Sequence, residues 1–123
     1  MAKPSSRSTL KEYALRRLGA PVIEINVDDH VLICDAGTGI IPLGNKLISD
    51  DKQKELLILL SHFHWDHISG LPFFVPAFYS KYNISFFGPG GSKEVIKKYI
   101  DDQMKAPYFP VGTEEWMAKI SYL

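Results

Sequence analysis

The chain has 123 residues, enough for one domain with a modest core. Its 14 Lys and Arg balance 14 Asp and Glu, and a net charge of zero argues against a general binder of nucleic acid or anionic membranes. The only cysteine, Cys34, cannot form an internal disulfide, and we find neither an apolar leader nor an apolar run of bilayer length. These features predict a cytoplasmic protein in a reducing compartment.

Apolar periodicity in the first half predicts strands and helices in alternation. Residues 8–19 carry an apolar stripe at helical spacing and end at a glycine. Residues 21–27 and 31–35 read as two strands of a hairpin, and a short helix is expected near 40–48. The apolar run 56–60 has no polar position, which predicts a strand buried on both sides.

The second half continues this pattern. A short helix is expected around 67–79, broken by two prolines, and Ser92 is placed to cap a longer helix. The predicted elements after the break are a strand at 84–88, helices at 93–104 and 113–118, and a strand that begins at 119. Interleaved strands and helices place the chain in the α/β class.

A cluster of histidines follows the apolar run directly. Three of the four histidines, His62, His64 and His67, lie here together with Asp66. Imidazole and carboxylate groups are ligands for zinc, iron or manganese. In an extended loop His62 and His64 face the same way, while Asp66 and His67 turn to the other side and can serve a second ion. A single histidine would be read as an ordinary surface residue, but this grouping predicts a metal site.

The spacing H-x-H-x-D-H resembles the signature of the metallo-β-lactamase-fold hydrolases. Residues 31–47 resemble the strand, acidic turn and helix of that superfamily. The segments at 59–74, 84–91 and 101–111 are similar to one bacterial branch of it, so the resemblance covers about residues 30–123. It implies an α/β fold that forms the N-terminal half of an αββα sandwich, left incomplete. The segments around the motif resemble the phosphodiesterase-like and ribonuclease-Z-like members more than the antibiotic-hydrolysing ones.

The same resemblance implies roles for individual residues. His62 and His64 would bind the first metal, and Asp66 and His67 the second. Asp66 would also be catalytic by orienting a metal-activated water, and Asp35 would support the ligands from behind. The implied cofactors are two divalent ions, with zinc expected and manganese or iron as alternatives. The implied substrate is a small molecule or a phosphodiester, with no membrane involved.

The chain departs from the family in its ligand count. The family supplies further histidines and a bridging aspartate downstream, whereas the only other histidine here is His30, upstream of the motif. Whether the chain is an enzyme by itself therefore stays open, and a partner chain or homodimer that completes the fold is one expectation. The missing second half also predicts an exposed apolar sheet face.

The N-terminal segment points elsewhere. Residues 10–29 resemble the N-terminus of the neck proteins of T4-like phages. We therefore expect a chain of two pieces: residues 1–29, of uncertain origin, and residues 30–123, a truncated metallo-β-lactamase-like domain. Beside the hydrolase, two alternatives stay open: an inactive fragment that binds metal or a partner, and a fragment of a phage neck protein.

Two weaker signals concern Cys34 and the aromatic residues. Cys34 sits in an apolar strand, which favours an inert buried thiol over a nucleophile. Aromatic side chains near the motif and near the C-terminus either line a substrate pocket or belong to the core. They are Trp65, Tyr108, Phe109 and Trp116.

Overall fold

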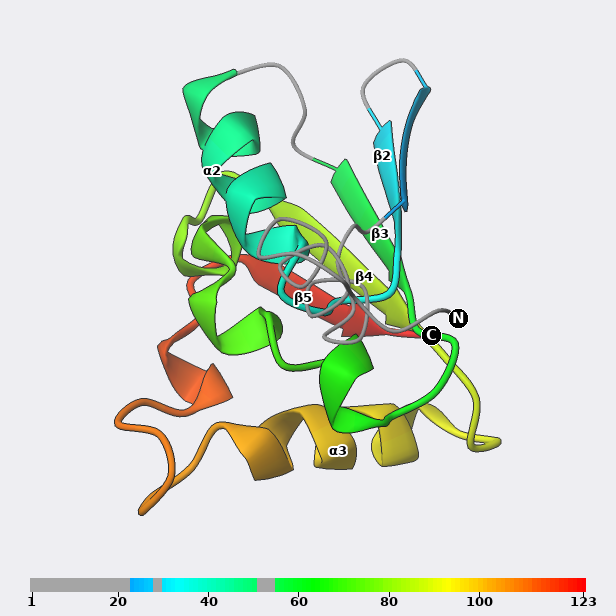
Figure 1. Cartoon of the computed structure of the whole chain (residues 1–123), viewed down its shortest axis with the longest axis vertical. Coiled ribbons are helices and arrows are strands. Elements are labelled where there is room, and N and C mark those ends of the chain that lie inside the picture. The colour runs from blue at the N-terminus through cyan, green and yellow to red at the C-terminus, as the bar shows by residue number, and fades with distance from the viewer. Residues whose placement is uncertain (1–22, 28–29, 51–54) are drawn as a thin grey trace, which may run out of the picture.

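The computed structural model describes residues 23–27, 30–50 and 55–123, shown in Figure 1. The helix predicted at 8–19 lies outside the described residues. Within them, five strands form one mixed sheet in the order β1-β2-β3-β4-β5. The first two strands are antiparallel and the remaining neighbours are parallel. Parallel strands joined through helical segments confirm the predicted α/β class.

The strands and helices lie close to their predicted positions. The strands are β1 (Ile23–Val27), β2 (His30–Cys34), β3 (Glu55–Leu59), β4 (Asn83–Phe87) and β5 (Lys119–Tyr122). The α-helices in the described part are α2 (Ile40–Ser49) and α3 (Lys93–Gln103). Ser92 caps α3 as predicted, because its side chain accepts a hydrogen bond from Val95 N.

Two predicted helices are replaced by 3₁₀ turns. The helix expected at 67–79 is wrong: η1 (Trp65–His67), η2 (Leu71–Phe73) and η3 (Val75–Phe78) take its place. A proline lies in the first turn of both η2 and η3. Proline has no backbone N–H to donate to a preceding helical turn, and its ring clashes with that turn, so a continuous helix cannot run through it. The helix expected at 113–118 is reduced to η4 (Thr113–Glu115).

One face of the sheet forms the core with the helical segments. Alternate residues of the three central strands are buried on this face, namely Val31, Ile33, Leu56, Ile58, Ile84 and Phe86. Residues of α2, η2, η3 and α3 complete the same cluster. The alternation shows that the predicted burial of 56–60 on both sides is wrong, because Leu57 and Leu59 stay half-buried.

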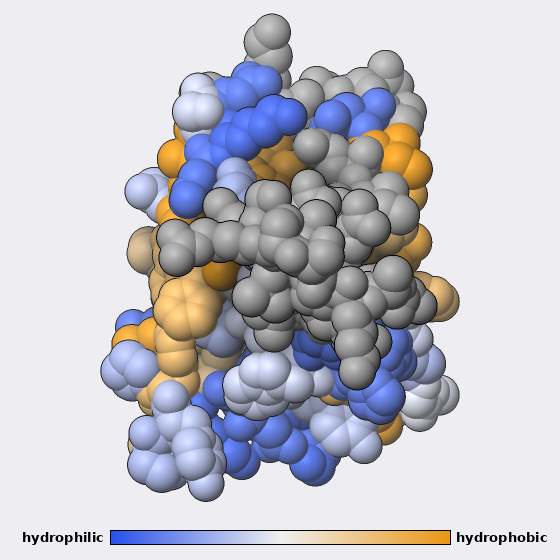
Figure 2. All heavy atoms as spheres, in the orientation of Figure 1, coloured by the Kyte–Doolittle hydropathy of each residue, from blue (hydrophilic) through white to orange (hydrophobic). Residues whose placement is uncertain are grey.

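The other face of the sheet carries apolar residues that are only partly covered. It includes Leu32 and Cys34 of β2, both half-buried, with the free thiol at the strand end. Two side chains on this face are more exposed: Ile25 of β1 is 46% exposed, and Phe87 of β4 is 53% exposed. Figure 2 shows hydrophobic surface along the edge formed by β1 and β2. The prediction of an exposed apolar sheet face is confirmed at these positions.

The boundary predicted after residue 29 falls between two paired strands. Strand β1 pairs with β2 over its whole length, from Ile23 opposite Cys34 to Val27 opposite His30. The division into two pieces stays a prediction. No helix in the described part is long and apolar enough to cross a membrane.

Candidate functional site

The candidate site is built where β2 and β3 end. These strands are parallel and in register, with Cys34 opposite Leu59, so the residues that follow them emerge side by side. Asp35 N donates to Leu59 O at 2.7 Å. The carboxyl ends of parallel strands are the usual place for sites in α/β sheets. Here they bring Asp35 next to Ser61, at the start of the histidine loop.

Asp35 is the centre of a hydrogen-bond network. Its Oδ1 accepts from Ser61 N at 2.7 Å, and both of its oxygens lie 2.9 Å from Ser61 Oγ. Its Oδ2 also lies 3.0 Å from His67 Nδ1. Asp35 has a φ of 65°, so it leaves the strand in which it was predicted to lie, in a conformation that non-glycine residues seldom adopt. This turn aims the carboxylate back across the end of β3.

The network also determines the charge of Asp35. Partial burial acts to raise the pKa of its carboxyl group. The hydrogen bonds from Ser61 N, Ser61 Oγ and His67, together with the charge of His67, outweigh that effect and lower the pKa below its ordinary value. Asp35 is therefore a stable anion at neutral pH, able to polarise the groups that donate to it.

Two histidines are oriented by this network. His67 Nδ1 faces Asp35, and His62 Nδ1 lies 2.9 Å from Ser61 Oγ. If Ser61 donates its hydroxyl proton to Asp35, its oxygen is left to accept from His62 Nδ1–H. His62 would then carry its proton on Nδ1, which leaves its Nε2 with a free lone pair. This is the tautomer that a metal-binding imidazole requires when Nε2 is the ligand.

The histidine rings gather on one side of the loop. The His62 and His64 ring centroids are 4.5 Å apart at an interplanar angle of 81°, and those of His62 and His67 are 4.1 Å apart at 47°. The predicted turn of His67 to the far side is not seen, because η1 folds the chain back through a bond from His67 N to His64 O at 2.9 Å. Asp66 Oδ2 lies 3.5 Å from His67 Nε2.

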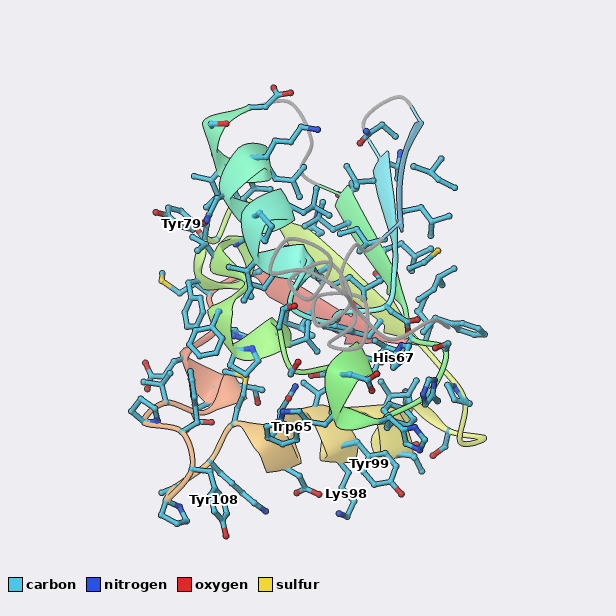
Figure 3. The ribbon with its side chains drawn as sticks, viewed as in Figure 1. Trp65, His67, Tyr79, Lys98, Tyr99 and Tyr108 are labelled. Atoms are coloured by element: carbon cyan, nitrogen blue, oxygen red, sulfur yellow. The ribbon has the colours of Figure 1, made fainter. Side chains whose placement is uncertain are left out.

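The metal itself stays a prediction. In residues 23–27, 30–50 and 55–123 no group of three or more His, Cys, Asp or Glu side chains has the arrangement of a formed metal site. The donors do fit such a site chemically, since they are three imidazoles and a carboxylate with Asp35 behind them. The four predicted ligands lie in one loop; His64 is exposed and the other three are half-buried. Figure 3 shows where His67 lies in the molecule.

Backbone bonds hold the histidine loop against the end of β2. Ala36 N donates to His67 O at 2.9 Å, and Gly70 N donates to Ala36 O at 3.0 Å. The approach at Gly70 is so close that a Cβ there would lie 2.1 Å from Gly37 O. The glycine therefore fixes the distance between Asp35 and the histidines.

A small pocket adjoins the loop on the side of α3. Its volume is about 270 Å³, and it is lined by Phe63, Trp65, Ile68, Tyr99, Asp102 and Gln103. Of the aromatic residues considered from the sequence, Trp65 lines this pocket and Trp116 is buried, whereas Tyr108 is 83% exposed. Phe109 and Trp116 line a second cavity of about 640 Å³ between α3 and β5.

Sequence reasoning missed the linking role of Ser61 and the contribution of Tyr99. Ser61 follows β3, and Asp35 follows β2. Because these two strands are parallel neighbours, polar residues just after them lie close together, and this was the signal for Ser61. Nothing in the sequence pairs Tyr99 with Phe63, since 36 positions separate them; the two ring centroids lie 4.9 Å apart.

Comparisons with known proteins agree with a hydrolase of the metallo-β-lactamase type. The chain is 29% identical over 102 residues to ribonuclease Z of Pyrococcus abyssi (strain GE5 / Orsay), which covers 80% of this chain and 33% of that protein. It is 43% identical over 61 residues to ribonuclease Z of Nanoarchaeum equitans (strain Kin4-M), covering 47% and 19% of the two chains. The chain thus spans a third or less of the length of these relatives.

A different match covers the N-terminus. The family described as "Bacteriophage T4 neck protein gp13" matches residues 1–33. Most of that segment lies outside the described residues, so no structural conclusion follows from this match. No solved structure matches the chain.

Proposed function

We propose that this chain carries part of the active site of a metal-dependent phosphodiesterase of the ribonuclease Z type, which hydrolyses RNA. The observation that carries the proposal is the network that joins Asp35, Ser61, His62 and His67 at the ends of β2 and β3. It places a carboxylate and a hydroxyl beside two imidazoles, in a chain that is similar to ribonuclease Z over 80% of its length. A set of merely exposed histidines would need no such carboxylate behind it.

In this proposal the residues divide the work as follows. His62 and His64 bind one divalent ion, and Asp66 and His67 bind a second. The ions, when bound, activate water and stabilise negative charge on the phosphodiester. Asp66 would accept a hydrogen bond from the attacking water and so orient it, and the Asp35 carboxylate would hold the His67 ring in place from its Nδ1 side. Zinc suits imidazole and carboxylate ligands best, and manganese or iron are the alternatives.

The number of ligands limits what one chain does alone. Four residues are fewer than two ions usually require from protein. We expect the remaining positions to be filled by water, by substrate, or by side chains that are not among these 123 residues. A partner chain that adds ligands would raise both the metal affinity and the activity of the site.

The test is metal content. Elemental analysis of the purified chain, with its size measured in the same run, should give one or two zinc, manganese or iron ions per chain. The double variant His64→Ala/His67→Ala should lose them. His30→Ala is the matched control, because His30 lies at the opposite end of β2 from the site. Equal metal content in the double variant and the control would overturn the proposal.

Activity provides the second part of the test. The metal-loaded chain should hydrolyse bis(p-nitrophenyl) phosphate, and a chelator should abolish this activity. A chain that binds metal but cleaves no phosphodiester, alone or with added zinc or manganese, would contradict the assignment as a phosphodiesterase.

A further inference from the structure

The pocket beside the histidine loop faces away from the imidazole cluster but belongs to the same loop. His62 and His64 direct their rings toward each other, whereas Phe63 and Trp65 line the pocket. Phe63 and Trp65 alternate along the loop with His62, His64 and Asp66, so the pocket and the proposed metal ligands are carried by the same short segment.

The walls of the pocket are aromatic and accessible. Trp65 is 67% exposed and Tyr99 is 42% exposed, an unusual amount for side chains of this size. In Figure 3, Trp65 and Tyr99 both lie where the loop passes over α3. Phe63 packs against Tyr99 at a centroid distance of 4.9 Å, which holds the tyrosine ring in place. The result is a set of ring faces open to a planar ligand.

The floor and the rim of the pocket add polar groups. Gln103 is 8% exposed, and its Nε2 donates to Ile68 O at 2.9 Å. Its Oε1 has no hydrogen-bond partner among the described residues, so this oxygen can accept a hydrogen bond from a ligand. Asp102 also lines the pocket, and its Oδ2 is paired with Lys98 Nζ at 2.6 Å. A planar aromatic ligand with amino groups on its edge would donate to these acceptors.

We propose that this pocket binds one nucleobase of a single-stranded nucleic acid, stacked on Trp65 and Tyr99, next to the phosphodiester that the histidine loop acts on. The inference rests on the proposed function, which supplies the phosphodiester. The volume of about 270 Å³ lies at the lower limit of ligand sites, about 300 Å³, and so suits a single base.

Binding can be tested without metal or catalysis. Equilibrium dialysis in the presence of a chelator would compare adenosine 5′-monophosphate with ribose 5-phosphate. We expect the nucleotide to bind at least about tenfold more tightly, because only the nucleotide carries a base. Its binding should also quench tryptophan fluorescence, and Trp65→Phe should remove this quenching because Trp116, the other tryptophan, is 7% exposed. Equal binding of the two probes would overturn the proposal.

Variants of Tyr99 locate the site. Tyr99→Ala should weaken nucleotide binding about tenfold, whereas Tyr99→Phe keeps the ring and should retain most of the affinity. Tyr108→Ala is the matched control, because Tyr108 is 83% exposed and lies outside the pocket. If Tyr99→Ala and Tyr108→Ala bind the nucleotide equally, the pocket is not the site. The Tyr99→Phe variant shows that any loss comes from the ring rather than from a failure to fold.

The outcomes separate this inference from the proposed function. Nucleotide binding that depends on Tyr99, in a chain that binds no metal, would support the pocket and count against the hydrolase. Metal binding without any preference for the nucleotide over ribose 5-phosphate would overturn the pocket alone. A fluorescence change that depends on protein concentration, and not on nucleotide concentration, would show that a second copy of the chain covers Trp65. That result would also overturn the proposal that the pocket binds a nucleobase.

Discussion

Asp35 Oδ2 lies 3.0 Å from His67 Nδ1, although the two residues are 32 positions apart and follow different elements. Asp35 directly follows β2, and His67 closes the 3₁₀ turn of the histidine loop. The parallel pairing of β2 with β3 brings them together, since it places the start of that loop beside Asp35. The contact connects the folding of the sheet to the chemistry of the proposed site.

The substitution Asp35→Asn tests this contact. Asparagine tolerates the positive φ of residue 35, so the backbone should be preserved while the charge is lost. A carboxylate behind a ligand histidine typically contributes about 10- to 100-fold in metal affinity, and we expect zinc binding to weaken by that factor. Titration with a competing chelator measures it. Asp102→Asn is the same chemical change on α3, at a carboxylate paired with Lys98 and Lys105, and it should leave zinc affinity unchanged. Equal losses in both variants would contradict the role of Asp35.

The motif and the sheet could be predicted because each depends on short-range patterns. His62, His64, Asp66 and His67 stand within six positions, and their chemistry is visible in the residue types alone. The alternation in β1 and the apolar run of β3 likewise placed the strands correctly. Asp35 could be assigned only through the family resemblance, because nothing local indicates which loop its carboxylate faces.

The errors in the prediction have a common physical cause. Local sequence patterns do not show which other segments pack against a strand face, or which backbone conformation a loop adopts. The apolar run of β3 suggested burial on both sides, but Leu57 and Leu59 are only half-buried. The two prolines after the motif predicted a broken helix, and the chain instead forms separate 3₁₀ turns there. A further 3₁₀ turn, η1, brings His67 back to His62. Side-chain convergence of this kind depends on tertiary structure.

Gly70 provides a second prediction, on stability. In Gly70→Ala the new methyl group would lie 2.1 Å from Gly37 O and 2.6 Å from Ile40 Cγ2, and a backbone oxygen cannot move aside easily. We expect a loss of about 3 kcal/mol or more in the free energy of unfolding, at the upper end for overpacking. Urea denaturation followed by circular dichroism measures it.

The control for Gly70 is a second glycine. Gly91 has a φ of 81° but open space around its Cβ position, so Gly91→Ala adds backbone strain without a collision. This strain costs roughly 1–2 kcal/mol. If Gly91→Ala destabilises the chain as much as Gly70→Ala, the close approach at Gly70 is not what holds the histidine loop.

The helix cap gives a third prediction. Ser92 Oγ accepts a hydrogen bond from Val95 N at 3.4 Å, at the start of α3, which forms one wall of the aromatic pocket. Replacing a capping serine by alanine costs about 0.5–2 kcal/mol, and the long distance here suggests the lower half of that range. Thermal unfolding should show a reduced midpoint for Ser92→Ala but not for Ser80→Ala, an exposed serine outside any helix. A midpoint for Ser92→Ala equal to that of the parent chain would show that the cap contributes nothing.

Tyr122 gives a fourth prediction, on alkaline pH. Burial, assisted by the negative charge of Asp101, raises the pKa of Tyr122 from 10.0 to about 12. The ring stacks on Phe86 with centroids 5.6 Å apart, so the phenolate would have to form against an apolar neighbour. Because the folded state keeps this proton where the unfolded state releases it, the contribution of Tyr122 to the free energy of unfolding should fall as the pH rises from about 10 to about 12. At lower pH the group is neutral in both states and has no such effect.

The chain has six tyrosines, so the measurement has to be a difference between two proteins. Phenolate absorbance is titrated for the parent chain and for Tyr122→Phe, and the difference isolates one group. We expect that difference to titrate near pH 12, and to shift to about 10 when urea unfolds both chains. A difference that titrates near 10 in the folded protein would mean that water reaches the ring, and that the stack on Phe86 does not exclude solvent from the edge of the sheet.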